Sequence, residues 1–193
     1  MKLLRCAALL FTAVFLSACA YGTKDQYASK TFVEKFTYVG DEAPSLTLLT
    51  MINNATGAGG HSSLLINGSQ TVMYDPAGRW KHSQVPEQHD LLYGINDQVL
   101  QYYKSFHARS SHHVVSQKVF VSPEVAEMAI AASKEQGRAL DATCATNTIA
   151  ILHQLPGFEE VKFSYFPAKL MRNFDELDGV ITTKYYENDE GQN

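Results

Sequence analysis

The chain has 193 residues, of which 16 are lysine or arginine and 20 are aspartate or glutamate, so its formal net charge is −4. The basic residues form no cluster along the chain, which excludes the usual electrostatic basis of nucleic-acid binding. After removal of an export signal, the remaining length allows one domain with a buried core.

The first 18 residues have the form of a lipoprotein signal peptide. A short basic region at residues 1–5 precedes an apolar run at residues 6–16, which is shorter than the roughly 20 apolar residues that span a bilayer. The sequence Leu-Ser-Ala-Cys at residues 16–19 has the form of a lipobox and predicts cleavage before Cys19, followed by its acylation. The alternative is an ordinary signal peptide that is cut at an Ala-x-Ala-like site.

Acylation of Cys19 predicts a protein held on a membrane without a spanning helix, because each buried CH₂ of an acyl chain contributes about 0.8 kcal/mol. Ala20 stands where an aspartate would indicate retention at the inner membrane. We therefore expect the outer membrane, with the domain facing the periplasm. Removal of residues 1–18 takes away Lys2 and Arg5, which leaves 14 basic against 20 acidic residues and a net charge of about −6.

The predicted organisation is a lipidated polar tether at residues 19–31, one domain at residues 32–186 and a flexible polar tail at residues 187–193. Within the domain, residues 45–52 and 61–66 are strand candidates, joined by a loop rich in glycine. Asn67-Gly68 predicts a tight type I′ hairpin turn before a return strand at residues 70–74. Residues 81–112 are harder to interpret, with a helix expected around residues 97–106, and residues 114–121 form a further strand candidate.

Two helices follow with clear start and stop signals. Ser122 is a good N-cap with proline at the next position, and Gly137 supplies the stop. The apolar face expected for this helix consists of Val125, Met128, Ala129 and Ala132. The second helix is expected to begin near residues 141–143 and to end at residue 155, with an apolar stripe formed by Thr148, Ile151, Leu152 and Leu155 and with Cys144 on the same side.

Cys144 is the only thiol in the expected mature domain, since Cys6 lies in the export signal and Cys19 in the lipobox. Cysteines of exported proteins are usually paired, so an unpaired one is either an inert buried residue or a reactive group. A cysteine in the first turn of a helix lies near the positive end of the helix dipole, which lowers its pKa below the ordinary value of about 8.5. The absence of a partner thiol favours the reactive interpretation.

A nucleophilic thiol needs a base and an orienting group. His61 is the favoured base, because it opens a strand directly after Gly59-Gly60, where another element can approach closely. Asp75, at the end of the return strand, is the favoured orienting group, although an Asp-Pro pair is also a common turn signal. The remaining histidines are interpreted as surface or loop residues: His82, His89, His107, His112, His113 and His153. No metal-binding spacing such as His-Glu-x-x-His is present, so we expect neither a metal nor a cofactor.

The order of these features resembles the circularly permuted papain-like superfamily, which includes permuted relatives of the NlpC-type cell-wall hydrolases and lecithin:retinol acyltransferase-like enzymes. A Gly-His pair opens a hairpin, a further strand and a Ser-Pro-Glu helix start follow, and a cysteine stands at the next helix start. The resemblance covers roughly residues 45–170. It implies an α+β fold in which a small antiparallel sheet packs against helices, with Cys144 as nucleophile, His61 as base and Asp75 nearest to the third position. Many relatives have His, Asn or Gln there, so the aspartate is a departure.

These features predict an envelope-anchored cysteine hydrolase or acyl-transfer enzyme that acts on an amide or ester bond, with a peptidoglycan peptide or an acyl lipid as its substrate. The alternative is a non-catalytic envelope lipoprotein that uses the same fold as a binding or scaffold module. A third hypothesis is an immunity or accessory protein that binds another envelope factor.

Overall fold

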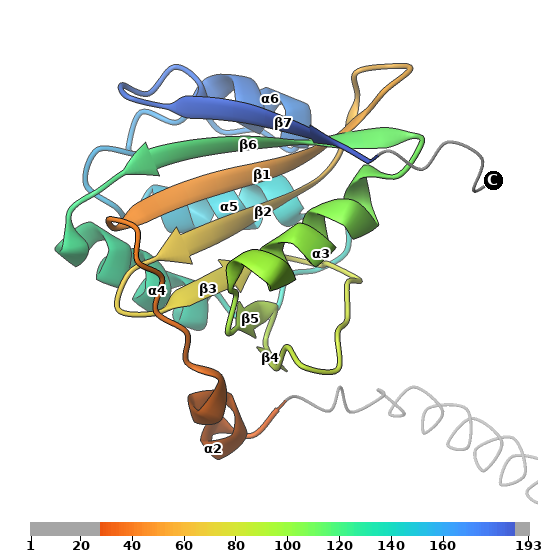
Figure 1. Ribbon diagram of the computed structural model, residues 1–193. Coiled ribbons are helices and arrows are strands. Elements are labelled where there is room, and N and C mark those ends of the chain that lie inside the picture. The colour runs from red at the N-terminus through yellow and green to blue at the C-terminus, as the bar shows by residue number, and fades with distance from the viewer. Residues whose placement is uncertain (1–27, 188–193) are drawn as a thin grey trace, which may run out of the picture.

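The computed structural model of the protein describes residues 28–187, which form an antiparallel sheet with helices on both faces (Figure 1). The sheet has seven strands in the order β4-β5-β3-β2-β1-β6-β7. The strands are β1 (Ser45–Asn53), β2 (Gly59–Asn67), β3 (Thr71–Tyr74), β4 (Glu87–Gln88), β5 (Leu91–Tyr93), β6 (His112–Phe120) and β7 (Ile181–Tyr186). The helices are α2 (Lys30–Val33), α3 (Asp97–Ala108), α4 (Pro123–Gln136), α5 (Cys144–Leu152) and α6 (Pro167–Phe174), with a short 3-10 helix η1 (Glu34–Phe36). The expected α+β class is confirmed.

The core has two layers, because side chains of a strand alternate between the two faces of a sheet. Leu46 and Leu48 of β1 pack in the cluster that contains residues of α4, α5 and α6. Leu49 and Met51 of the same strand pack in the second cluster, which contains residues of α3. In Figure 1, α3 accordingly lies in front of the sheet and α4, α5 and α6 lie behind it. The central strands are therefore buried on both faces, which explains their nearly continuous apolar sequence.

The hairpin between β2 and β3 forms as expected, but the predicted type I′ turn is wrong. Asn67 is the last residue of β2 and pairs with Thr71, so the connection has three residues, and Gly68 has no positive φ. The Asn67 side chain donates to the carbonyl oxygens of residues 42 and 43 and accepts from the Thr71 hydroxyl at 2.9 Å. These bonds hold Asn67 in the strand, where it cannot take the central position of a tight turn.

Helix α4 has the predicted bounds, with the Ser122 hydroxyl accepting from the Val125 N–H and Gly137 at φ 67°. Its predicted apolar face is partly wrong, because Met128 is 41% exposed whereas Ala126 and Ile130 are buried. Helix α5 begins at Cys144 and ends at Leu152, three residues before the predicted end. All four members of its predicted apolar stripe are buried.

Several elements were not predicted from the sequence, namely β4, β5, α6 and β7. Helix α2 begins at Lys30, inside the segment that the sequence assigns to the tether. The predicted signal peptide, the lipidation site at Cys19 and nearly all of the predicted tail lie outside the described residues. Between residues 28 and 187, no helix has the length and apolar character needed to cross a membrane.

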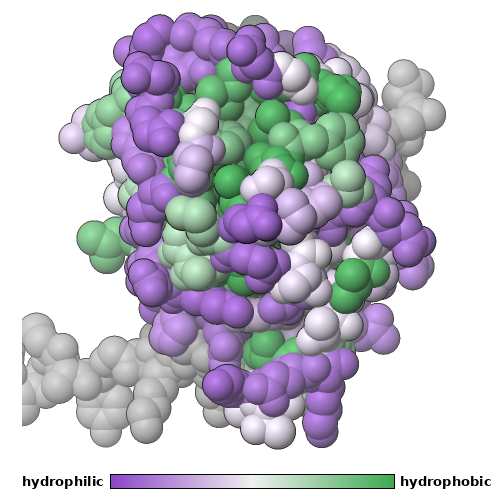
Figure 2. All heavy atoms as spheres, turned by 90° about the vertical axis from the view of Figure 1, so that its left-hand side faces the viewer, coloured by the Kyte–Doolittle hydropathy of each residue, from purple (hydrophilic) through white to green (hydrophobic). Residues whose placement is uncertain are grey.

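The end of the sheet at which β1 begins faces the viewer in Figure 2, where apolar side chains gather between hydrophilic ones. At this end, Phe120 closes β6 and Ile181 opens β7, and both are about half exposed. Both also line a cavity of about 570 Å³, to which α3 contributes Leu100 and Lys104.

Candidate catalytic site

His61 lies near the start of β2, where the strand is irregular. The pairing of β1 with β2 shifts between Met51, opposite His61, and Ile52, opposite Gly59, so Gly60 has no partner. A side chain at Gly59 would place a Cβ only 2.4 Å from the backbone nitrogen of Ala168 in α6. Gly59 therefore allows α6 to approach β2 closely. The side chain of His61, two residues later, is 17% exposed.

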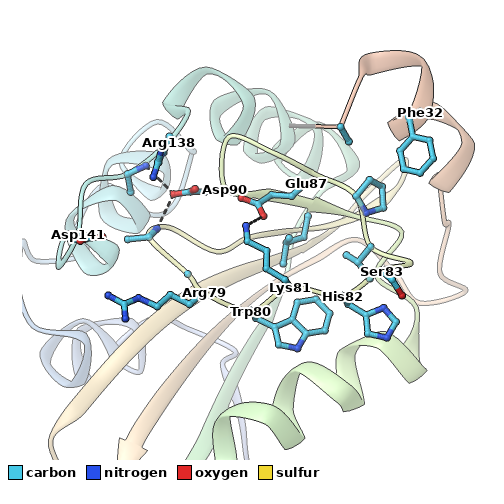
Figure 3. Close-up of a pocket in the computed structure, with 17 residues that line it drawn as sticks. Phe32, Arg79, Trp80, Lys81, His82, Ser83, Glu87, Asp90, Arg138 and Asp141 are labelled. Carbon is cyan, nitrogen blue, oxygen red and sulfur yellow. Dashed lines mark hydrogen bonds and ion pairs between the residues drawn. The ribbon is translucent and has the colours of Figure 1, made fainter. Parts of the chain in front are cut away.

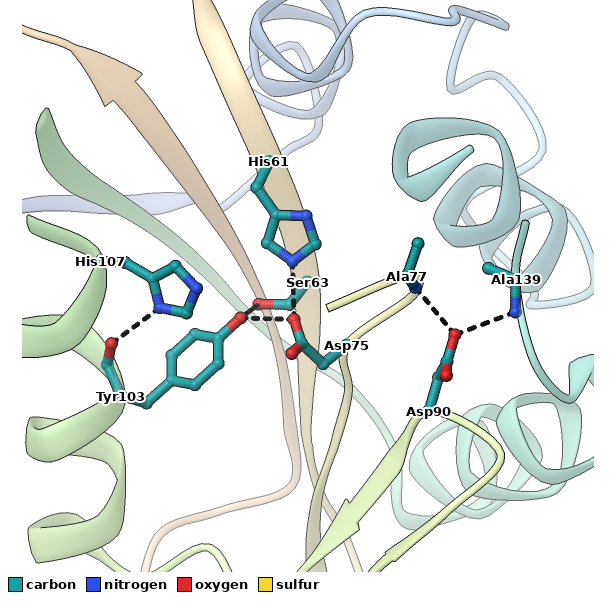
Figure 4. Close-up of polar contacts among 8 residues, drawn as sticks. All are labelled: His61, Ser63, Asp75, Ala77, Asp90, Tyr103, His107 and Ala139. Atoms are coloured by element: carbon teal, nitrogen blue, oxygen red, sulfur yellow. Dashed lines mark hydrogen bonds and ion pairs between the residues drawn. The ribbon is translucent and has the colours of Figure 1, made fainter. Parts of the chain in front are cut away.

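Asp75 directly follows the last residue of β3, and its carboxylate reaches back to His61. The His61 Nε2 lies 2.6 Å from the Asp75 Oδ1, and the Asp75 side chain is only 4% exposed (Figure 4). The loop after Asp75 passes close to the carboxylate, because a Cβ on Gly78 would lie 1.8 Å from Oδ2. The predicted partnership of His61 and Asp75 is thus present as a short hydrogen bond.

Cys144 is the first residue of α5, is free and is 7% exposed. The turn before it is fixed by side chains of the helix start. The Asn147 amide donates to the Thr143 carbonyl oxygen at 2.9 Å and in turn accepts from the Gln136 amide at 2.7 Å. The backbone at Ala142 has φ 61°, an uncommon conformation for a residue with a side chain. This turn leads directly into the first residue of α5, which carries the thiol.

Cys144 and His61 approach from opposite faces of the sheet. Ser62 and Leu64 point to the side of α5, whereas His61 and Ser63 point to the side of α3. β3 pairs with β2 only as far as Leu64, so beyond that residue β2 has no neighbour on its β3 side. At this open edge, the His61 ring and the Ser62 backbone N–H are close enough to the Cys144 thiol to lower its pKa. Because Asp75 occupies Nε2, the other ring nitrogen of His61 is left for the sulfur.

Each of the three groups stabilises the charged form of its neighbour. Burial disfavours the charged form of His61, but its hydrogen bonds to Asp75 and Cys144 outweigh burial and raise the pKa of His61 to about 10. Burial likewise acts against ionised Cys144 and Asp75, yet the contacts with His61 lower the pKa of both groups below their ordinary values. Compared with the isolated groups, the arrangement therefore favours a thiolate, an imidazolium and a carboxylate in a row.

Residues of α3 that the sequence reasoning missed complete the site. The Tyr103 hydroxyl lies 2.6 Å from the Asp75 Oδ1 and 3.0 Å from the Ser63 Oγ. His107 was interpreted as a surface or loop residue, which is wrong: its ring stacks on His61 with centroids 5.9 Å apart, and burial lowers its pKa. The Nδ1 of His107 lies 2.9 Å from the Tyr103 carbonyl oxygen. The four-residue spacing of Tyr103 and His107, which puts both on one face of a helix, is a signal that could have found them.

Two further histidines, His113 and His153, make contacts away from the candidate site. His113 is buried, stacks on Tyr186 and hydrogen-bonds to the Asn54 side chain, so its interpretation as a surface residue is also wrong. His153 lies 2.7 Å from the Val161 carbonyl oxygen. Within residues 28–187, no group of three or more His, Cys, Asp or Glu side chains is placed to hold a metal ion.

A cavity of about 1030 Å³ (Figure 3) is lined by residues that follow Asp75 and precede Cys144 in the sequence, although Cys144, His61 and Asp75 are not themselves among its lining residues. One wall is the loop that follows Asp75, and another is the segment at residues 138–141 that leads into α5. Asp90 joins these two walls, because its Oδ2 accepts the N–H of Ala77 at 2.8 Å and that of Ala139 at 2.9 Å (Figure 4). Charged side chains around the cavity are Arg79, Lys81, Glu87, Asp90, Arg138 and Asp141, and Trp80 is its largest aromatic residue.

Comparison with known proteins gives no relative: no family model, no curated protein and no solved structure matches this chain. The resemblance to the permuted papain-like superfamily therefore depends on the order of the sequence features alone and stays a prediction.

Proposed function

We propose that this protein is a cysteine-dependent hydrolase or acyl-transfer enzyme that acts on an amide or ester bond. The observation that carries the proposal is the single chain of contacts from Cys144 through His61 to Asp75. A thiol, an imidazole and a carboxylate in this order are the parts that nucleophilic acyl transfer requires.

The proposed reaction has two steps. The Cys144 thiolate attacks the substrate carbonyl carbon, and the His61 imidazolium gives its proton to the departing amine or alcohol, which leaves an acyl-thioester on the enzyme. A water molecule or a second acceptor then gives a proton to His61 and attacks the thioester, which releases the product and restores the thiolate. Backbone N–H groups at the start of α5 are suited to hold the oxyanion, because the first turn of a helix has unpaired donors.

The cavity lined by the loop after Asp75 supports a polar substrate more than a long acyl chain. Its charged residues come from both walls, and Lys81 and Glu87 form an ion pair within it. Burying a hydrocarbon chain against charged groups removes their hydration without replacing it. A peptide, which carries its own amide groups and charges, can supply that replacement.

The proposed location is the outer membrane, with the domain attached through an acylated Cys19. Residues 19–27 can span at most about 30 Å between the anchor and the first described residue. This reach keeps the site close to the membrane and to the cell wall.

The test is to incubate the purified protein with peptidoglycan sacculi and, separately, with phospholipid vesicles, and to compare the products with those of Cys144→Ala. Release of new peptide ends or of fatty acid by the wild type alone is the expected result. Identical product profiles for the two proteins on both substrates would contradict an enzyme for either substrate class.

The alternative is a non-catalytic binding module, and the low exposure of Cys144 favours it. The two functions differ in thiol reactivity. A catalytic thiol reacts with iodoacetamide at neutral pH faster than a free model thiol, whereas a sealed structural thiol reacts more slowly.

A further inference from the structure

We propose that Tyr103 is a positioning residue of the candidate catalytic site, through which helix α3 holds the Asp75 carboxylate in the orientation that aligns His61. The inference rests on the proposed function, since positioning has a meaning only if Cys144 and His61 react. It assigns a role to a helix that the resemblance and the sequence reasoning left without one.

The first support is a shared atom. Tyr103 of α3 and His61 of β2 are both hydrogen-bonded to the Asp75 Oδ1, each at 2.6 Å. The Tyr103 hydroxyl has one proton, which goes to the carboxylate because a carboxylate can only accept. The Ser63 hydroxyl, 3.0 Å away, therefore donates to Tyr103. The result is a directed chain from Ser63 through Tyr103 to the oxygen that receives the His61 N–H.

The second support is that Asp75 needs such a partner. It lies beyond the last paired residue of β3, so no strand pairing fixes its side chain on the β2 side. Tyr103 and His61 are the hydrogen-bond partners that meet at its Oδ1. Without the Tyr103 hydroxyl, Oδ1 would keep only its bond to the imidazole, and the close approach of the Gly78 loop to Oδ2 would supply no hydrogen bond in its place. The carboxylate would then be less firmly held about its terminal torsion.

The third support is the rigidity of the Tyr103 ring. Its side chain is fully buried, with the Trp80 ring edge-on at 5.4 Å and the His107 ring at 4.3 Å. A ring clamped in this way places its hydroxyl without further loss of side-chain entropy. The neighbouring Tyr102 is 47% exposed, and its hydroxyl accepts from the Gln98 amide on the same helix, so it provides a matched control.

The expected direction of the effect follows from the groups that face Asp75. These are His61 from β2, Tyr103 and His107 from α3, and Cys144 from α5 through His61. The Tyr103 hydrogen bond is one of the contacts that lower the pKa of Asp75. Its removal raises that pKa and loosens the carboxylate, which weakens the support of the His61 imidazolium and raises the pKa of the Cys144 thiol.

The experiment measures the rate of Cys144 alkylation by iodoacetamide as a function of pH in the wild type, Tyr103→Phe and Tyr102→Phe, with the fold of each checked by circular dichroism. We expect the acid limb of the Tyr103→Phe profile to move up by about one pH unit, which is about a tenfold lower rate on that limb, because a hydrogen bond to a charged group is lost. Tyr102→Phe leaves the profile unchanged.

Ser63→Ala and Ser63→Thr keep the inference testable if Tyr103→Phe does not fold. Ser63→Ala moves the acid limb in the same direction by less, and Ser63→Thr retains the hydroxyl and the wild-type profile. A low thiol pKa in the wild type that neither Tyr103→Phe nor Ser63→Ala shifts would overturn the inference and leave the proposed function intact. An ordinary thiol pKa in the wild type would overturn both.

Discussion

The imidazole of His61 lies between two groups that are both more stable as anions when the ring is charged. Asp75 is on one side at 2.6 Å, and the Cys144 thiol is on the other. Burial alone would favour a neutral ring, so the raised pKa of His61 depends on both partners. A change in either partner should therefore change the pKa of His61.

The first prediction concerns the thiol pKa. The pKa of Cys144 lies below its ordinary value and that of His61 is about 10, so the thiolate–imidazolium pair persists between these two values. Alkylation of Cys144 should accordingly begin well below the ordinary thiol pKa of about 8.5. In His61→Ala the thiol loses its charged partner, and its pKa should rise. An unchanged thiol pKa in this variant would show that the two residues are not coupled.

The second prediction ranks the three residues by their effect on turnover. Cys144→Ala and His61→Ala should each abolish it, and the double variant should be no worse, because nucleophile and base act as one unit. Asp75→Asn should leave a measurable remnant, since the amide oxygen can still accept a hydrogen bond but carries no charge. Turnover of the substrate identified with sacculi or vesicles provides the measurement. Equal and additive losses would argue against a shared mechanism.

The third prediction uses Gly78 to disturb Asp75 without replacing it. A Cβ at this position would lie 1.8 Å from the Asp75 Oδ2, so Gly78→Ala pushes the carboxylate away from His61. Because the atom that must move is the end of a side chain, the fold should persist while turnover falls to the level of Asp75→Asn. Gly60→Ala is the control, since its Cβ would meet nothing closer than 3.7 Å. A fully active Gly78→Ala would show that the orientation of Asp75 is unimportant.

At the scale of elements, Asp90 links the two chain segments that carry the site. Its carboxylate accepts from the N–H groups of Ala77 and Ala139, and its own carbonyl oxygen accepts the N–H of Asp75 at 2.8 Å. Asp90 has φ 67°, a conformation that asparagine and glycine tolerate. Asp90→Gly therefore removes the side-chain acceptor but allows the same backbone conformation, whereas Asp90→Asn keeps both an acceptor and that conformation.

The fourth prediction follows from that difference. Asp90→Gly should lower the free energy of unfolding by about 2 kcal/mol, because backbone N–H groups lose a buried acceptor, and it should reduce turnover as the two walls separate. Asp90→Asn retains an acceptor and should stay closer to the wild type in both respects. Urea unfolding and turnover provide the measurements. Equal effects of the two variants would mean that the hydrogen bonds from Ala77 and Ala139 to the Asp90 side chain do not hold the two walls together.

The helices with clear caps could be predicted from the sequence, because a cap is a local signal. Ser122 and Gly137 gave the bounds of α4 correctly. The pairing of His61 with Asp75 could also be anticipated, because a hairpin brings the two ends of its strands together. The contact of Cys144 with His61 was expected from the glycines that precede His61 and from the resemblance, but no local pattern places α5 at the open edge of β2.

Other features depend on contacts between distant segments. Strands β4 and β5 are only two and three residues long, too short to show an alternating pattern. Strand β7 is largely exposed and lies at the sheet edge, so its sequence lacks the apolar alternation of a buried strand. Tyr103 was missed because its partners Asp75 and Ser63 are 28 and 40 residues away along the chain.

For the whole molecule, the two core clusters consist of described residues from Val33 onward. The buried apolar residues of the helices pack against those of the central strands, so the stability of the domain resides in this part of the chain. The predicted anchor at Cys19 precedes it. Attachment to a membrane and folding of the domain should therefore be separable.

The last prediction tests that separation in the full-length chain. Cys19→Ala should abolish acylation, so that the protein either becomes soluble in cell fractionation or accumulates as unprocessed precursor, because one residue carries the lipid. Its urea unfolding midpoint should equal that of the wild type, since the substitution lies outside the core. Mass spectrometry of the wild-type N-terminus should show a diacylglyceryl-modified Cys19. An unmodified N-terminus beyond residue 19 would contradict the anchor, and a shifted unfolding midpoint in Cys19→Ala would show that the tether contributes to the fold.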